Sequence, residues 1–169
     1  MKKIIKFIEA TSLWTGKTAR WLSVALVLLM TFEVFMRYVF RRPTMWGYET
    51  MIMTGAAMYA LAWAYVHREK AHIRVDVFYM RLSARGKAVI DAICTFFLFF
   101  PLISLLGYMA FSWMVRAWKI GEKSVESYWY PPIAPLRTAV FLGLLFFGLQ
   151  GLAQFIRDVY LLIRNKSYD

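Results

Sequence analysis

The sequence predicts an all-α integral membrane protein, and three observations support that prediction. The chain is 60% hydrophobic and 18% aromatic, whereas soluble domains contain about 45–50% apolar residues. Its mean hydropathy is +0.49. Its apolar residues fall into four runs of the length that crosses a bilayer, about 20 residues or more. No convincing strand pattern interrupts them, so we expect four transmembrane helices in a single membrane domain, residues 1–169.

The N-terminal segment, residues 3–15, is predicted to be an amphipathic helix that lies on the membrane surface. Lys6 and Glu9 interrupt its apolar residues, whereas a signal peptide needs a continuous apolar core. In this interpretation the lysines meet anionic headgroups. The apolar side chains enter the lipid: Ile4, Ile5, Phe7, Ile8 and Trp14.

The four apolar runs define the expected spans, at about 19–40, 46–66, 88–115 and 136–163. The third and fourth runs exceed the minimum length, which predicts tilt or emergence from the bilayer. Pro101 lies inside the third run. A proline in a helix interior removes a hydrogen bond and clashes with the preceding turn, so we expect a kink there.

Lysine and arginine predict the orientation of these spans, because such residues concentrate on the cytoplasmic side. The N-terminal segment, the connection after the second span and the C-terminal end carry 14 of them, and the two opposite connections carry five. We therefore expect both termini in the cytoplasm, with residues 41–45 and 116–135 on the other side.

The charge and the reactive residues exclude several functions. The formal net charge of +11 follows from this topology, and no nucleic-acid recognition motif accompanies it. Cys94 is the only cysteine, so no internal disulfide forms. His67 and His72 lie five residues apart near one membrane surface, which does not suit haem or metal ligation. No nucleophile with its base is visible, so we expect neither an enzyme nor a cofactor.

Glu33 and Arg37 lie four residues apart within the first apolar run, and that spacing puts them on one helical face. A lone charge in hydrocarbon costs at least about 2.5–3.5 kcal/mol, which pairing reduces. One interpretation is a structural ion pair near the outer interface, from which Arg37 also reaches Glu49. The other is that Glu33 carries protons, but an adjacent arginine opposes protonation.

The connection after the second span contains "HIRVDVF", residues 72–78, in which polar and apolar residues alternate. His72, Arg74 and Asp76 either belong to a solvated basic loop or form an element that docks on a partner. The residues alone leave both interpretations open.

Two stretches resemble the small membrane subunit of the TRAP transporters, the tripartite ATP-independent periplasmic carriers. They are "FEVFMRYVFRRPTMWGYE", residues 32–49, and "HREKAHIRVD", residues 67–76. A weaker match is "GLLFFGLQ", residues 143–150, after a proline-containing loop. The residues that match the family pattern are Glu33, Arg37, Tyr38, Phe40, Pro43, Trp46 and Glu49, then His72, Arg74 and Asp76. The likeness to this Q subunit, of the DctQ type, covers nearly the whole chain.

The resemblance implies a function that spacing alone does not show. It implies a small scaffold subunit in the bacterial inner membrane, packed against a large elevator-type subunit that carries the substrate and sodium sites. A periplasmic binding protein would deliver an organic acid, and the small subunit would bind no substrate. Small residues of the second span would allow close helix packing: Gly55, Ala56, Ala57 and Ala60.

Two other functions are compatible with a small four-span protein. The first is a self-contained proton-coupled exporter that uses Glu33. The second is a membrane anchor associated with haem or quinone. A scaffold subunit differs from both because it co-purifies with a much larger membrane partner.

Overall fold

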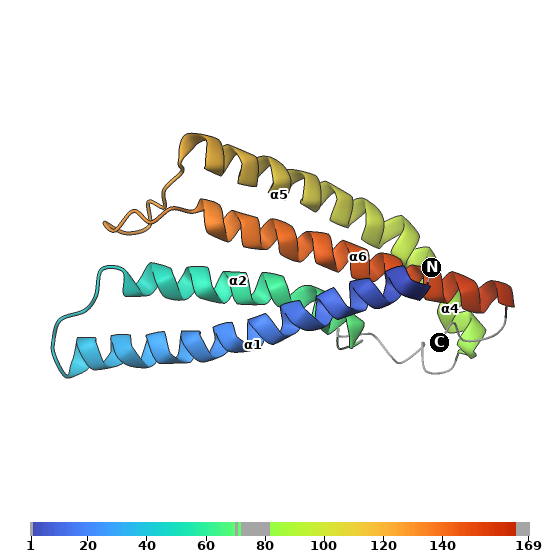
Figure 1. Ribbon diagram of the computed structural model, residues 1–169, viewed down its shortest axis with the longest axis horizontal. Coiled ribbons are helices and arrows are strands. Elements are labelled where there is room, and N and C mark those ends of the chain that lie inside the picture. Colours follow the sequence, from blue (N-terminus) through green and yellow to red (C-terminus); the bar gives the residue numbers. More distant parts are fainter. Residues whose placement is uncertain (1, 70, 72–81, 165–169) are drawn as a thin grey trace.

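The computed structural model describes residues 2–69, 71 and 82–164, and this part of the chain is almost entirely helical. The elements are α1 (Lys2–Tyr38), α2 (Gly47–Arg68), α4 (Ala84–Cys94), the π-helical turn η1 (Thr95–Phe99), α5 (Phe100–Ile120) and α6 (Ala134–Arg164) (Figure 1). No strand occurs among these residues, and the only extended pairing within them is an isolated bridge between Lys123 and Pro132. The all-α prediction is confirmed.

Three helices of the described part are long and apolar enough to cross a membrane. They cover Ile5–Tyr38, Arg85–Ile120 and Ala134–Arg164. The last two contain the predicted third and fourth spans, and the first corresponds to the predicted first span but ends two residues earlier. The remaining predicted span corresponds to α2, which has 22 residues but is less apolar and does not belong to this set. The chain is thus a multi-pass membrane protein.

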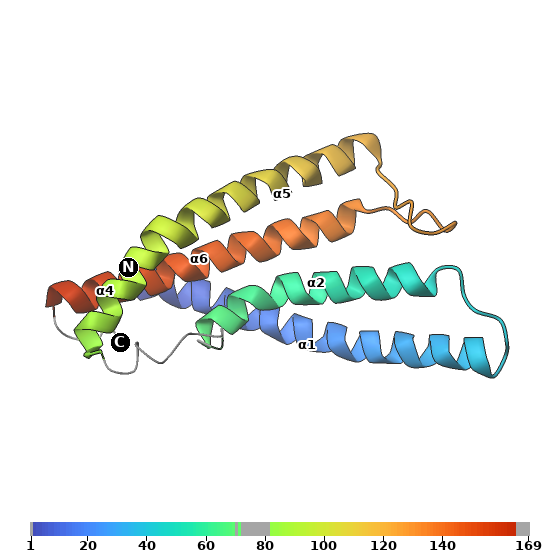
Figure 2. The same ribbon diagram turned by 180° about the vertical axis from the view of Figure 1, so that it is seen from behind.

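Consecutive long helices of the chain run in opposite directions, and in space they lie side by side in the order α1, α2, α6, α5 (Figures 1 and 2). Helix α2 packs along both α1 and α6, and α5 packs along α6. The connections 39–46 and 121–133 lie at one end of the molecule, and the N-terminus and the end of α6 lie at the other. The central pair therefore consists of α2 and α6, which run in the same direction.

The first 15 residues do not form a separate helix, in contrast to the prediction. They continue into the first span as one helix of 37 residues. No proline interrupts it, and the hydroxyls of Thr15 and Thr18 bond to carbonyls of the preceding turn. Ile5 and Ile8 are buried against Ala153 of α6, rather than in lipid. Packing on α6 thus extends α1 beyond the length that a bilayer needs.

The expected break at Pro101 takes the form of a wide helical turn. The Phe100 amide bonds to the Thr95 carbonyl, five residues back, and the helix bends between α4 and α5 (Figure 2). A proline ring clashes with the carbonyl four residues before it, and the wider π turn gives it room. The turn also places Phe99 against α6, where a Cβ atom on Gly151 would come within 2.6 Å of the ring.

Small residues allow the backbones of neighbouring helices to approach closely. A Cβ atom on Gly143 would lie 2.7 Å from the carbonyl carbon of Ala60, and one on Gly16 would lie 2.6 Å from the Tyr65 ring. The predicted role of Ala60 in close packing is thus observed. Gly55 is different, because its nearest neighbour, a methyl group of Leu26, would be 3.9 Å away.

We predict that Gly143→Ala destabilises the protein although alanine favours helices. The added methyl group would clash with backbone atoms of Ala60, which cannot move aside as a flexible side chain could. Overpacking of this kind costs about 1–3 kcal/mol, and it exceeds the helix-propensity gain of about 1 kcal/mol. Thermal unfolding in detergent, followed by circular dichroism, should show a lower midpoint.

Gly107→Ala is the matched control, because nothing lies within 4 Å of a Cβ atom there. It should be neutral or slightly stabilising. Adding Ala60→Gly to Gly143→Ala should restore little, since the backbone of residue 60 still blocks the methyl. Equal midpoints for the two alanine variants would contradict the close approach.

Candidate functional site

Glu33 is a buried carboxylate at the end of the α1–α2 hairpin, with only 4% of its surface exposed. Its Oε1 lies 3.1 Å from Arg37 Nη2. Its Oε2 accepts the Thr44 hydroxyl and, at 3.4 Å, the Thr44 backbone amide. The predicted ion pair is therefore present, but Thr44 of the hairpin connection supplies two of the three hydrogen bonds to Glu33.

Thr44 ties the connection to both helices, because its hydroxyl also accepts the Gly47 amide at 3.2 Å. The first amides of a helix lack partners within the helix, and Trp46 at the N-cap gives no side-chain bond. A side chain on Gly47 would have no room, since its Cβ would lie 2.6 Å from Glu33 Oε2. Thr44 was not among the predicted residues, although a hydroxyl residue just before an apolar run is a helix-start signal.

Glu49 does not contact Arg37, contrary to the sequence interpretation. It is 2% exposed, and its Oε1 accepts the Ser124 hydroxyl at 2.7 Å. Its Oε2 has no hydrogen-bond partner in the described part of the chain. Arg37 remains with Glu33, and its side chain is 53% exposed. Glu49 therefore ties α2 to the connection between α5 and α6, rather than to α1.

The connection between α5 and α6 has its own charged contact. Arg137 Nη2 lies 2.6 Å from Glu122 Oε1, and Arg137 Nη1 donates to the Trp113 carbonyl at 3.2 Å. The guanidinium also lies 5.9 Å from the centre of the Trp113 ring. Arg137 lies at the start of the predicted fourth span, about 136–163. Its acidic partner lies 15 residues earlier, beyond the range of helical spacing patterns.

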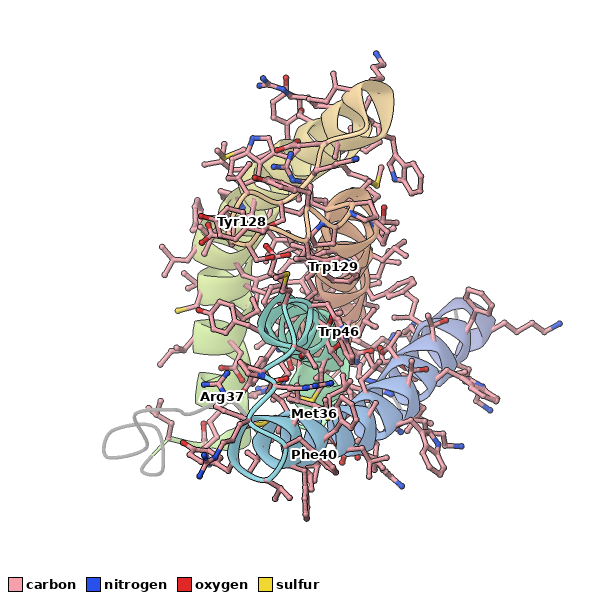
Figure 3. The ribbon with its side chains drawn as sticks, turned by 90° about the vertical axis from the view of Figure 1, so that its left-hand side faces the viewer. Met36, Arg37, Phe40, Trp46, Tyr128 and Trp129 are labelled. Atoms are coloured by element: carbon pink, nitrogen blue, oxygen red, sulfur yellow. The ribbon has the colours of Figure 1, made fainter. Side chains whose placement is uncertain are left out.

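The other predicted residues of the hairpin lie on its surface. Tyr38 and Pro43 are exposed, and Trp46 stacks on Phe32 with 6.0 Å between the ring centres. In the end-on view, Arg37, Phe40 and Trp46 surround the connection (Figure 3). The predicted residues His72, Arg74 and Asp76 lie outside the described residues.

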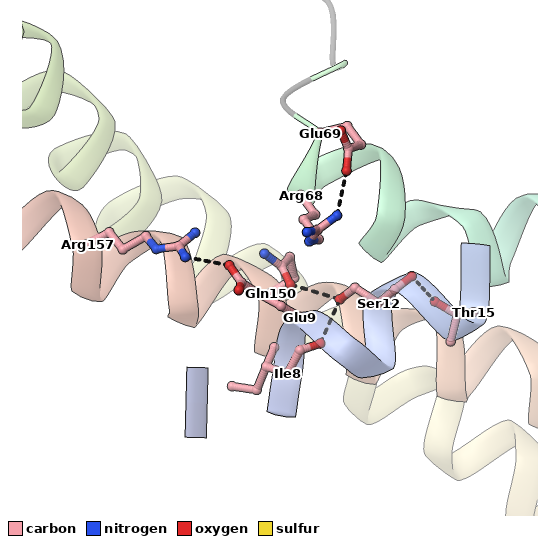
Figure 4. A network of polar contacts seen from close by, with 8 residues as sticks. All are labelled: Ile8, Glu9, Ser12, Thr15, Arg68, Glu69, Gln150 and Arg157. Atoms are coloured by element: carbon pink, nitrogen blue, oxygen red, sulfur yellow. Dashed lines mark hydrogen bonds and ion pairs between the residues drawn. The ribbon is translucent and has the colours of Figure 1, made fainter. Parts of the chain in front are cut away.

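The opposite end of the molecule has a second set of polar contacts, between α1 and α6 (Figure 4). Glu9 Oε1 lies 2.5 Å from Arg157 Nη2, and the Ser12 hydroxyl donates to Gln150 Oε1 at 2.8 Å. Ser12 and Gln150 are nearly fully buried. The role of Ser12 was hidden from sequence reasoning because its partner Gln150 is brought to it only by the tertiary fold.

These contacts are suited to holding helices in place rather than to chemistry. No group of three potential metal ligands occurs among residues 2–69, 71 and 82–164. His67 lies between aromatic rings, 5.6 Å from the centre of Phe99 and 5.3 Å from that of Phe147. The cavities between the helices are lined mainly by apolar side chains.

We predict that Thr44→Val destabilises the hairpin by about 1–3 kcal/mol, because it removes the hydroxyl that bonds to both the Glu33 carboxylate and the Gly47 amide. Thr44→Ser should restore most of the loss. Thr50→Val is the control, because the Thr50 hydroxyl bonds only to the Trp46 carbonyl of its own helix. The midpoint of thermal unfolding in detergent is the measurement.

A double-mutant cycle separates the two halves of the Glu33 site. The unfolding free energies of Glu33→Gln, Arg37→Gln and the double variant give the interaction energy between the two side chains. We expect it to be below about 1 kcal/mol, since Arg37 is half exposed and the pair is screened by solvent. If Arg37→Gln costs more than Thr44→Val, the ion pair and not the threonine holds the hairpin.

Comparison with known protein families gives a match over nearly the whole chain. Residues 7–160 match the family described as the DctQ component of tripartite ATP-independent periplasmic transporters. A search of curated proteins gives no match. The matched range begins within α1 and ends within α6, so it includes both sets of polar contacts. The resemblance noted from the motifs is confirmed, and the chain belongs to the DctQ family, the small membrane component of TRAP transporters.

Proposed function

We propose that the protein is the scaffold subunit of a sodium-coupled TRAP transporter that imports an organic acid. In this proposal a periplasmic binding protein delivers the solute, and a large elevator-type subunit carries the substrate and sodium sites. The small subunit packs against the large one and binds no substrate. Family membership over residues 7–160 is the observation that carries the proposal, since the family is a transporter component rather than an enzyme family.

The described geometry supports a static role. Buried polar contacts tie α1 to α2, α2 to the α5–α6 connection, and α1 to α6. Buried hydrogen-bonded networks rigidify the elements they join. A scaffold against which another domain moves needs such rigidity. The hairpin held in this way would then present its exposed aromatic residues, such as Tyr38, to the large subunit.

The exporter alternative requires a carboxyl group that exchanges protons with a pathway. Glu33 is instead held by Arg37 and by the hydroxyl and amide of Thr44. Each of these groups stabilises the charged carboxylate and opposes proton uptake. The Glu33 site therefore favours the scaffold function over the exporter.

We further propose that α2 is a fourth span and that both termini lie in the cytoplasm. Helix α2 is 22 residues long, or about 33 Å at 1.5 Å per residue, which matches the hydrocarbon thickness of about 30 Å. It packs between α1 and α6, both of which are long and apolar enough to span. The excess of basic residues near the two termini sets the orientation in the inner membrane.

Cysteine labelling in intact cells tests this topology. Ser124 is a poor labelling site because it is buried and bonded to Glu49. Val125 is 82% exposed in the same connection, so in a Cys94→Ala background Val125→Cys should react with an impermeant thiol reagent. Arg85→Cys, exposed at the start of α4, should react only after the cells are opened. The reverse pattern would overturn the orientation.

Reconstitution tests the transport function. The chain alone in vesicles should transport no organic acid. With the large subunit, the binding protein and an inward sodium gradient, uptake should appear and should stop when the small subunit is omitted. Glu33→Gln should leave the sodium dependence unchanged. Saturable, proton-driven transport by the isolated chain, lost in Glu33→Gln, would instead support the exporter.

A further inference from the structure

The face of α1 that points away from α6 near the N-terminus carries three largely exposed aromatic side chains. Phe7, Trp14 and Trp21 are 74%, 69% and 73% exposed. They recur every seven residues, which places them in one stripe along the helix. Their opposite side is occupied, because Ile8 and Ser12 pack on α6. Trp14 and Trp21 therefore face away from α6, whereas Phe7 lies at the edge of the space between α1 and α6.

The charges beside this stripe have one sign. Four basic residues of the segment are exposed: Lys3, Lys6, Lys17 and Arg20. The ammonium group of Lys17 lies 5.3 Å from the centre of the Trp14 ring. Glu9 is the only acidic residue among the first 32, and Arg157 neutralises it at 2.5 Å. The face thus combines aromatic and cationic groups, the combination found in helices that bind anionic lipid surfaces.

A groove of about 510 Å³ opens next to the stripe, between α1 and α6. Its lining consists of Phe7, Ile8, Thr11, Ser12, Phe146 and Leu149. The two hydroxyls in this lining are already used, because Thr11 donates to the Phe7 carbonyl and Ser12 to Gln150. The groove therefore offers apolar walls without an unused donor, which suits a hydrocarbon chain rather than a polar solute.

The depth of the groove fits the boundary between hydrocarbon and headgroups. Helices α2 and α6 run in the same direction, with Gly143 beside Ala60. Phe146 and Leu149 follow Gly143 by three and six residues along α6, so they lie level with the last turns of α2. Since α2 is about as long as the hydrocarbon core is thick, these turns reach the inner boundary. Lys3 precedes Phe7 by one turn, on the headgroup side.

We propose that this groove binds one anionic phospholipid of the cytoplasmic leaflet. One acyl chain lies between α1 and α6 against Phe146 and Leu149. The phosphate lies near Lys3 and Lys6, and Phe7, at the N-terminal end of the stripe, lies next to the headgroup. The site would fix the tilt of the N-terminal part of α1, which is longer than a span requires. The assignment to the cytoplasmic leaflet rests on the proposed topology.

Native mass spectrometry of the full chain in detergent tests the site. The protein is titrated with phosphatidylglycerol and with phosphatidylcholine of the same acyl chains. The wild type should bind one phosphatidylglycerol about tenfold more tightly, as expected for two lysines beside one phosphate. Lys3→Gln with Lys6→Gln should remove this preference. Lys119→Gln with Lys123→Gln, at the opposite end of the molecule, should retain it.

Filling the groove tests the acyl chain separately. Thr11→Trp should weaken binding of both lipids at least tenfold, and Leu149→Trp should do the same from the α6 side. Thr18→Trp is the control, because Thr18 is exposed on α1 but does not line the groove. Circular dichroism verifies that each variant is folded. If only one of Thr11→Trp and Leu149→Trp folds, that variant alone is enough for the test.

Three results would overturn the proposal. The first is equal affinity of the wild type for the two lipids. The second is tight lipid binding by both groove-filling variants. The third is loss of assembly with the large subunit in Thr11→Trp while its lipid binding is unchanged, because the groove would then hold a helix of that subunit. Reversed cysteine labelling would overturn the leaflet assignment, whereas a failed uptake assay would affect only the proposed transport function.

Discussion

The backbone contact between α2 and α6 is the constraint on which the rest of the arrangement depends. At Ala60 and Gly143 the two helices are close enough to exclude a single additional methyl group. In lipid there is little hydrophobic force between helices, so close packing of small residues supplies much of their association. The outer helices then attach to this pair, α1 along α2 and α5 along α6. A change in the spacing of the central pair would move both outer helices.

Polar contacts complete this arrangement at the two ends of the molecule, where lipid gives way to water. Glu33 with Thr44 and Glu49 with Ser124 lie at one end, and Glu9 with Arg157 lies at the other. The middle is held by packing of apolar and small side chains. This division follows from the cost of unpaired polar groups in hydrocarbon. It also means that the polar contacts at the ends determine how the helices are aligned along their axes, while the packing in the middle determines the distance between the axes.

The sequence was sufficient for the features that depend on local pattern. Four apolar runs gave the helices, and the spacing of Glu33 and Arg37 gave their ion pair. The partners of Glu49 and Arg137 were out of reach because they come from the α5–α6 connection, whose path depends on Gly121 and Tyr130 adopting positive φ angles. The continuity of α1 was missed for a related reason, since contacts with α6 outweighed the local interruption at residues 15–18.

The π turn at Thr95–Phe99 has a consequence for how this helix tolerates changes in length. One α-helical residue corresponds to about 100° of rotation, and the wide turn absorbs one extra residue without passing that rotation on to α5. Deleting a residue between Thr95 and Phe99 would convert the turn into a regular α-helical one and leave the later side chains facing α6. A deletion further along α5 has no such turn to absorb it, so it would rotate every later side chain away from α6. The irregular turn is therefore the place in this helix where the chain can lose a residue without changing which side chains face α6.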